Sequence, residues 1–139
     1  IQQVRYKKRF KYELYMDESI KDLPCPKIIL QPLIENSLKH GMSDMPGCTL
    51  IVRARQEGYN IVLSVEDDGL GIPPEKLKKL QEMLRDDSNI MVKKSRYGIG
   101  LRNTNRRIKL LYGSDYGLTI ESEVEERTCV TITFPKHRP

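Results

Sequence analysis

The sequence predicts an α+β domain, a two-layer α/β sandwich with helices on one face of a mixed, mostly antiparallel sheet. Two patterns indicate this fold class. Runs of alternating apolar and polar residues occur in neighbouring pairs, and runs with apolar residues three or four positions apart lie between them. The length of 139 residues is that of one ordinary domain. A content of 38% apolar and 31% charged residues is typical of a globular chain.

The elements are expected in the order strand, helix, two strands, two helices, two strands. Alternating or β-rich runs predict the strands at 10–16, 50–54, 61–65, 118–123 and 128–134. Helical spacing predicts the helices at about 26–41, 75–85 and 98–113. Gly41 and Gly113 are expected to end the first and last helices, Pro32 to kink the first, and Gly58-Tyr59-Asn60 to form a hairpin turn. Three other segments are predicted as a polar connection, a loop and a mobile loop: 17–22, 42–48 and 86–95.

The formal net charge of +5 is concentrated in two blocks. Residues 1–12 hold five basic and no acidic side chains, residues 88–109 hold seven and none, and the rest of the chain is net acidic. A nucleic-acid-binding surface needs phosphate contacts along a continuous face, together with aromatic side chains on which bases stack. With segmented charge, two Phe and no Trp, the sequence does not favour a nucleic-acid partner.

The cysteines and histidines exclude two kinds of small-domain framework. Cys25, Cys48 and Cys129 are odd in number and form no CxxC pair, and the chain has only two histidines. This argues against a zinc site or a disulfide framework and favours a reducing compartment. No apolar run approaches the ~20 residues of a spanning helix. Because the chain opens on Ile1, it is interpreted as a piece of a longer protein, with targeting or membrane segments expected upstream.

One motif follows a predicted strand directly. In Asp67-Asp68-Gly69-Leu70-Gly71, a carboxylate at a strand end precedes two glycines. That pattern suits a buried hydrogen-bond acceptor beside backbone that a ligand approaches closely. Taken alone, however, the motif is interpreted as an ordinary turn in preference to a site.

A second motif, Gly98-Ile99-Gly100, precedes a predicted helix. Unpaired N–H groups and the positive end of a helix are suited to bind phosphate, and the basic block around the motif would attract a polyanion. The motif is neither the dinucleotide GxGxxG nor a Walker A loop. The other interpretation, a solvated helix face, is preferred for Arg106, Arg107 and Lys109.

A third group interrupts the apolar stripe of the first helix. Asn36, Lys39 and His40 stand at i, i+3 and i+4, so they share one face. An Asn oxygen is a hard ligand suited to Mg²⁺, which leaves most of its coordination to phosphate and water. A polar face on an amphipathic helix is the alternative for these residues taken by themselves.

Taken together, the three motifs resemble a known family. The segments "LQPLIENSLKHG", "VEDDGLGIP" and "YGIGLRNTNRRIKLLYG" are similar in order and spacing to the N, G1 and G2 boxes of the GHKL ATPase superfamily, which has the Bergerat fold. The residues within these boxes resemble those of the catalytic domain of LytS/YesM-type sensor histidine kinases. The resemblance covers roughly residues 10–135.

The resemblance implies that ATP and Mg²⁺ are the ligands, and it assigns roles to individual residues. It places Asn36 on Mg²⁺ and Lys39 and His40 near the phosphates and ribose. It makes Asp67 the acceptor for the adenine amino group. The remaining matches are to the adenine pocket, the phosphate-binding turn and a pocket threonine, namely Gly69, Gly71, Tyr97, Gly98, Ile99, Gly100, Leu101 and Thr128.

The resemblance also implies a domain layout and two departures. Residues 1–9 would be a basic linker from a phosphoacceptor module, 10–136 the catalytic domain with an ATP lid at about 72–97, and 137–139 a tail. Pro32 stands where gyrase-like ATPases carry a general-base Glu, so vigorous hydrolysis is not expected. The neighbouring Glu35 is a hypothetical base. Arg127 replaces a usual Gly.

The implied function is that of a protein-histidine kinase in a two-component system. The partners would be a His on an upstream dimerising module, in a homodimer, and a response regulator, and the full protein would sit in the membrane with this domain in the cytoplasm. No segment like the HPHFLFN motif is present, and neither His40 nor His137 is expected to accept phosphate. The fragment is therefore expected to bind ATP without autophosphorylation. The alternatives are an anti-sigma-factor-type serine kinase and a non-catalytic nucleotide-sensing module.

Overall fold

The computed structural model describes residues 2–7, 10–20, 27–37, 48–85 and 99–136. Its elements are a six-stranded sheet, three α-helices and one turn of 3₁₀ helix, η1. The strands are β1 Gln2–Lys7, β2 Phe10–Met16, β3 Cys48–Glu57, β4 Asn60–Asp67, β5 Gly117–Glu123 and β6 Arg127–Pro135. The helices are α1 Lys27–Asn36, α2 Pro74–Arg85, α3 Ile99–Tyr112 and η1 Glu18–Ile20.

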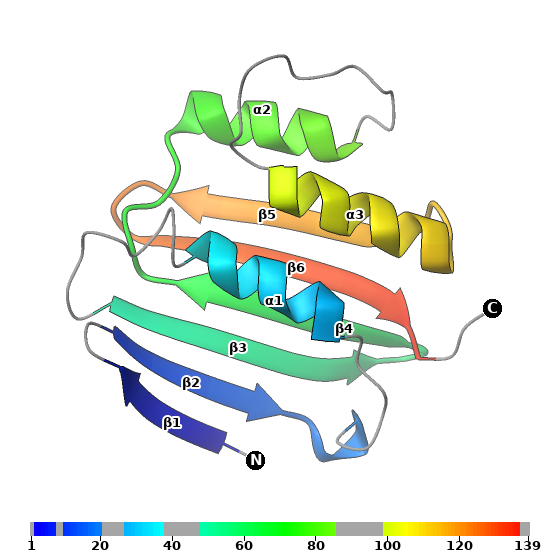
Figure 1. The fold of residues 1–139 in the computed structure, drawn as a ribbon, viewed down its shortest axis with the longest axis horizontal. Helices are drawn as coiled ribbons and strands as arrows, with labels where there is room; N and C mark the ends of the chain where they lie inside the picture. Colours follow the sequence, from blue (N-terminus) through cyan, green and yellow to red (C-terminus); the bar gives the residue numbers. More distant parts are fainter. Residues whose placement is uncertain (1, 8–9, 21–26, 38–47, 86–98, 137–139) are drawn as a thin grey trace.

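The sheet has the order β1-β2-β3-β4-β6-β5, and only β2 and β3 pair in parallel. Figure 1 shows α1 and α3 lying over the sheet, with α2 beyond them on the β5 side. The predicted class, helices layered on a mixed and mostly antiparallel sheet, is therefore confirmed. The parallel pair follows from chain order, since β2 is connected to β3 through η1 and α1 instead of through a tight turn.

The core lies between the helices and the facing side of the sheet. Along β6 every second residue is buried, as the alternating sequence predicts. The helices contribute residues at helical spacing to this core, since Leu80 and Leu84 of α2 and Leu101 and Ile108 of α3 are buried. Leu33 of α1 is fully buried as well.

The predicted elements are found; β2 has the predicted bounds, and the other predicted strands are longer than expected. The hairpin turn at Gly58 joins β3 to β4, and its φ of +59° is one that glycine adopts readily. Pro32 lies inside α1 without ending it. The predicted helix end at Gly41, the loop at 42–47 and the mobile loop at 86–95 lie outside the described residues.

The N-terminal segment has regular structure that the sequence analysis did not predict. Residues 2–7 form strand β1, antiparallel to β2, where the sequence suggested a linker before the domain. The run Gln3, Val4, Arg5, Tyr6 contains β-forming residues between the charges, and the dense basic block obscured that pattern. The assignment of 1–9 as a connection to another module stays a prediction.

Two further findings concern features that the sequence raised. The thiols of Cys48 and Cys129 are free, and burial raises the pKa of both. Cys25 lies outside the described residues. No helix in the part of the chain that the structure describes is long and apolar enough to cross a membrane.

Candidate functional site

Strand β4 ends in a buried carboxylate. Asp67 is 1% exposed, and no other Asp or Glu among the described residues is buried. Its Oδ1 accepts a hydrogen bond from the backbone N–H of Gly69 at 3.1 Å. Its Oδ2 is buried and has no hydrogen-bond partner among the described residues. A buried acceptor in this state is costly unless a ligand or water satisfies it.

The electrostatics of Asp67 reflect this burial. Burial raises the pKa of its carboxyl above the ordinary value for Asp, and the charges of Asp68 and Glu66 add to the rise. The Gly69 N–H opposes the rise, and so does the hydroxyl of Ser37, which lies close to the carboxyl but outside hydrogen-bonding geometry. A hydrogen-bond donor brought to Oδ2 would stabilise the ionised form further.

Two buried hydroxyl groups lie near this carboxylate. Thr128, at the start of β6, is paired with Asp67 across the β4–β6 ladder, so the two side chains lie on the same face of the sheet. Ser37 directly follows α1, and its buried Oγ has no partner within the described ranges. Figure 1 shows the ends of α1 and β4 and the start of β6 on the same side of the domain. An acceptor and two hydroxyls from three elements distant in sequence therefore lie in one region.

The loop after β4 is hydrogen-bonded to β3 on one side and to the β5–β6 turn on the other. Toward β3, Asp68 Oδ1 accepts from the Thr49 N–H at 2.6 Å, and the Asp68 N–H donates to the Thr49 carbonyl at 3.3 Å. Toward the β5–β6 turn, the Leu70 carbonyl accepts from the Glu125 N–H at 2.7 Å. Gly71 has a φ of +72°, and a Cβ there would meet the Glu123 carbonyl. The loop therefore needs glycine at this position.

Ser122 is hydrogen-bonded to Ile72, the next residue of the same loop. Its Oγ accepts from the backbone N–H of Ile72 at 2.8 Å and lies 2.8 Å from Thr128 Oγ1. The end of β5 is thus hydrogen-bonded both to the loop and to the threonine beside Asp67. Ser122 was not singled out by the sequence, although it occupies the inward-facing position after Leu118 and Ile120.

The first turn of α3 carries part of the G2 box. Gly100 is exposed, and a Cβ added there would meet no atom of another described segment within 4 Å. The Gly100 carbonyl accepts from Thr104 Oγ1 at 2.8 Å. Leu101 is buried in the core, and Ile99 begins the helix. Within the described part of the chain, the space beside Gly100 is therefore unfilled.

Asn36 and Glu35, adjacent in sequence, differ in exposure. Asn36 is the half-buried last residue of α1. Glu35 is exposed, and its Oε1 accepts from Gln31 Nε2 one turn earlier at 3.0 Å. Four further predicted site residues lie outside the described residues: Lys39, His40, Tyr97 and Gly98.

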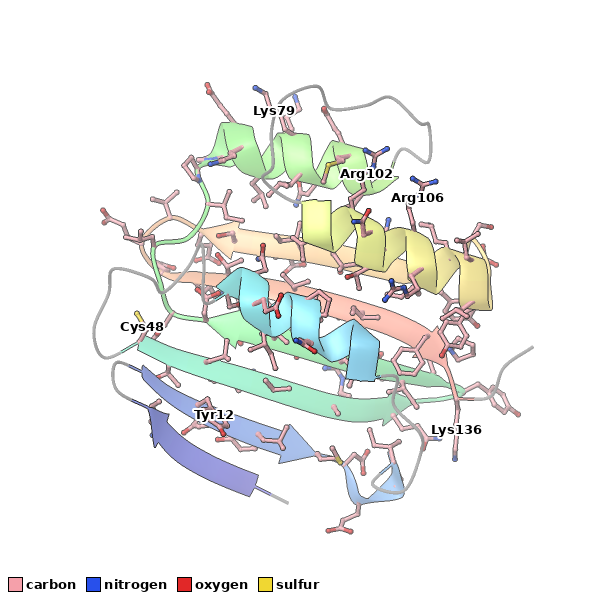
Figure 2. The ribbon with its side chains drawn as sticks, viewed as in Figure 1. Tyr12, Cys48, Lys79, Arg102, Arg106 and Lys136 are labelled. Carbon is pink, nitrogen blue, oxygen red and sulfur yellow. The ribbon has the colours of Figure 1, made fainter. Side chains whose placement is uncertain are left out.

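The basic residues of α3 differ in exposure. Figure 2 shows Arg102 and Arg106 extending from α3 on the side of α2. Arg106 and Arg107 are exposed, and Lys109 donates to the Ser114 carbonyl at 3.0 Å. The exposure of Arg106 and Arg107 fits the interpretation of a solvated helix face, whereas Lys109 is half-buried and bonded to a backbone carbonyl.

A separate hollow of about 530 Å³ lies between α2, the C-terminal half of α3 and the edge strand β5. Its lining includes Asn105, whose Nδ2 donates to the Leu84 carbonyl at 2.9 Å and whose Oδ1 accepts from the Leu118 N–H at 2.8 Å. Gln81 Nε2 donates to the Ile120 carbonyl at 2.9 Å. These polar groups have partners, so the hollow lacks the unsatisfied acceptor that marks the Asp67 region.

Of the predicted site residues, the structure brings Asp67, Gly69, Gly71 and Thr128 together, with α1 ending nearby at Asn36. It adds Ser37, which sequence reasoning missed although it adjoins Asn36 in the first motif. Chemically, the arrangement offers acceptors to a ligand group that carries N–H or O–H donors.

Comparison with known proteins gives a consistent set of similarities. The family model described as histidine kinase-, DNA gyrase B- and HSP90-like ATPase matches residues 22–138. The chain is 33% identical over 136 residues to the sensor histidine kinase YesM of Bacillus subtilis, covering 97% of this chain and 21% of YesM. It is 31% identical over 137 residues to the sensor protein LytS of Bacillus anthracis, covering 98% of this chain and 22% of LytS.

Solved structures share the fold at lower identity. The histidine kinase AdeS of Acinetobacter baumannii aligns with a TM-score of 0.64 at 20% identity, over 94% of this chain and 56% of that one. The blue-light activated histidine kinase EL346 of Erythrobacter litoralis aligns with a TM-score of 0.63 at 20% identity, over 93% of this chain and 36% of that one. The chain spans about a fifth of the length of the curated relatives that it matches. These similarities agree with the resemblance that the three boxes indicated.

Proposed function

The chain belongs to the family of histidine kinase-, DNA gyrase B- and HSP90-like ATPases, and from this membership we propose that it is the catalytic domain of a sensor histidine kinase. Membership makes it an ATP-binding domain. The single observation that carries the proposal at the level of residues is the buried Oδ2 of Asp67, which lacks a partner among the described residues. The amino group of adenine supplies the N–H that this acceptor requires.

Discrimination among bases follows from the same carboxylate. An ionised Asp can only accept hydrogen bonds, so it pairs with the exocyclic amine of adenine and repels the carbonyl that guanine presents at that position. The fastened loop of Gly69 and Gly71 gives the base a fixed wall. ATP is therefore the preferred nucleotide.

We place Mg²⁺ at Asn36, whose amide oxygen is a suitable hard ligand. Mg²⁺ bound with the nucleotide neutralises charge that develops on the phosphates. Lys39, His40 and the backbone of Tyr97 to Leu101 are proposed to contact the phosphates and ribose. Phosphoryl transfer depends mostly on such positioning and charge neutralisation.

The domain is built to present the γ-phosphoryl group and not to hydrolyse it. Pro32, four residues before Asn36, has no group that could activate water, and Glu35 pairs with Gln31 on the exposed side of α1. We propose that the acceptor is a His on an upstream dimerising module and that a response-regulator Asp receives the group next. The domain would then be the cytoplasmic part of a membrane-anchored homodimer.

Calorimetric titration of the 139-residue domain with ATP and ADP, with and without Mg²⁺, tests the proposal. Binding is expected in the micromolar range and to depend on Mg²⁺. Asp67→Ala should weaken it by roughly 100-fold, the loss of a charge-assisted hydrogen bond. Asn36→Ala should reduce the Mg²⁺ dependence. Asp115→Asn, an exposed carboxylate on the far turn, is the control and should bind like wild type.

Folded wild-type protein that binds no nucleotide would overturn the proposal. The kinase step is tested with radiolabelled ATP on a longer chain that carries a phosphoacceptor module. That chain should incorporate acid-labile phosphate, whereas the isolated domain should not. Label on serine in a partner protein would instead favour the serine-kinase alternative.

A further inference from the structure

Three hydrogen-bonding groups converge on one hydroxyl at the end of β5. The Oγ of Ser122 lies 2.8 Å from the backbone nitrogen of Ile72, 2.8 Å from the carbonyl oxygen of Arg127 and 2.8 Å from Oγ1 of Thr128. All three distances are those of good hydrogen bonds. A hydroxyl has one proton and two lone pairs, so these three contacts fill its capacity.

The identity of the three partners fixes the direction of each bond. The Ile72 N–H can only donate, so it occupies one lone pair of Ser122. The Arg127 carbonyl can only accept, so it takes the single Ser122 proton. The bond between the two hydroxyls must then run from Thr128 to the second lone pair of Ser122.

This direction determines what Thr128 can offer to the site. Its proton is donated to Ser122, so only lone pairs remain for a ligand. Across the β4–β6 ladder, Asp67 offers Oδ2, which also accepts. The two paired residues therefore present acceptors alone, where a threonine free to rotate could donate or accept as the ligand required.

We propose that Ser122 is a positioning residue that sets nucleotide specificity by holding the Thr128 hydroxyl as an acceptor. The inference rests on the proposed function and deepens it. A group with N–H donors, directly or through a water that donates, satisfies both acceptors. The 6-oxo oxygen of a purine is a third acceptor, to which neither Asp67 nor the Thr128 hydroxyl held by Ser122 can donate. In the absence of Ser122, Thr128 can turn its proton toward that carbonyl, and rejection of the 6-oxo base then depends on Asp67 alone.

The same hydroxyl connects specificity to the loop. Ile72 is the first residue of the segment predicted to be the ATP lid, and its backbone is hydrogen-bonded to Ser122. A variant at Ser122 can therefore loosen the loop as well as release Thr128. Loosening weakens the binding of every nucleotide alike, whereas a change in proton direction alters the ratio between nucleotides.

The experiment measures Kd for ADP and for IDP, which carries a 6-oxo group, by calorimetry. Wild type should prefer ADP. Ser122→Ala should lower the IDP-to-ADP ratio of Kd by roughly five- to tenfold, the range of one neutral hydrogen bond. Ser122→Thr, which keeps the hydroxyl, should restore the ratio. Ser122→Cys is the second variant if alanine unfolds the domain, because a thiol fills the same space but hydrogen-bonds weakly.

A double-mutant comparison separates the two roles of Ser122. In a Thr128→Val background there is no hydroxyl to orient, so Ser122→Ala should leave the ratio unchanged. The inference is overturned if Ser122→Ala and Ser122→Cys scale both Kd values equally, or if the ratio changes as much when the Thr128→Val substitution is already present. Wild type that binds neither nucleotide overturns the proposed function and the inference with it.

Discussion

Asp67 and Asn105 are both buried polar residues, and they differ in how their hydrogen-bonding capacity is met. Asn105 is bonded through both ends of its amide to the end of α2 and the start of β5. Asp67 has one oxygen satisfied and the other buried without a partner among the described residues. A satisfied buried group stabilises the fold, whereas an unsatisfied one costs stability and is kept where a ligand completes it.

The largest loss of stability is expected at Asn105, whose amide is fully hydrogen-bonded. Asn105→Ala leaves the Leu118 N–H and the Leu84 carbonyl unpaired in the interior, so it should lower the free energy of unfolding by about 2–4 kcal/mol. Chemical denaturation measures this. Asn103→Ala, exposed on the same helix, is the matched control and should change stability by less than about 0.5 kcal/mol. Equal losses would mean that the amide does not join the two elements.

The next effect is at the backbone that holds the site. Gly71 and Gly58 both have positive φ, +72° and +59°. A Cβ at Gly71 would lie 2.9 Å from Val124 Cα, while a Cβ at Gly58 would meet no atom of another described residue within 4 Å. Gly58→Ala should cost about 1 kcal/mol for backbone strain alone. Gly71→Ala should cost roughly 2 kcal/mol more, because the loop must also move away from the β5–β6 turn. The two variants are compared by denaturation, and similar costs would contradict the close approach.

The third prediction concerns Asp67, where a substitution is expected to raise stability instead of lowering it. The raised pKa of Asp67 means that the folded state holds the proton more tightly than the unfolded state does. Stability is therefore lost as pH rises from the ordinary Asp pKa, about 3.9, through the raised value. Asp67→Asn removes this loss and should stabilise the unliganded domain by on the order of 1 kcal/mol at neutral pH.

Denaturation curves of wild type and Asp67→Asn over a pH series check this linkage. The stability gained by Asp67→Asn should shrink as pH falls toward the ordinary pKa of Asp. ATP binding by this variant should be lost at every pH. A variant less stable than wild type at neutral pH would contradict the view that Asp67 is kept for a ligand.

The smallest effect is expected on the uncovered face of the sheet. Arg127 makes ion pairs with Glu66 at 3.3 Å, Glu123 at 3.7 Å and Glu121 at 4.0 Å. Every one of these side chains is at least partly open to solvent, where such pairs contribute little and are screened by salt. Arg127→Gly should lower the melting temperature only slightly, and the difference should shrink at high salt. A large, salt-independent loss would place Arg127 among the residues that hold the fold.

The sequence predicted the fold well where a pattern is local. The alternation in 128–134 and the helical spacing up to Gly113 agree with β6 and α3 to within a residue or two. Strand β1 was missed because its basic charges outweighed its β-forming residues. Strand order was not specified either, since the β2–β3 and β4–β6 pairings join segments with no local signal between them.

The site was predictable only in part, for the same reason. Asp67 stands out because a carboxylate precedes two glycines, but its pairing with Thr128 came from family resemblance and not from spacing. Ser122 and Asn105 each interrupt an apolar pattern, Ser122 after Leu118 and Ile120, and Asn105 between Leu101 and Ile108. A polar residue on an apolar face is the signal that would have singled out both.

The β4–β6 ladder has a consequence for how the domain folds. Each of the hairpins β3–β4 and β5–β6 closes locally, but Asp67 and Thr128 meet only when the two hairpins dock across a long stretch of chain. Closing such a long loop is entropically costly and is a slow step in sheet formation. If nucleotide binds at this pair as proposed, the ability to bind it arises only with that docking, and a bound nucleotide shifts the folding equilibrium toward chains that have completed it.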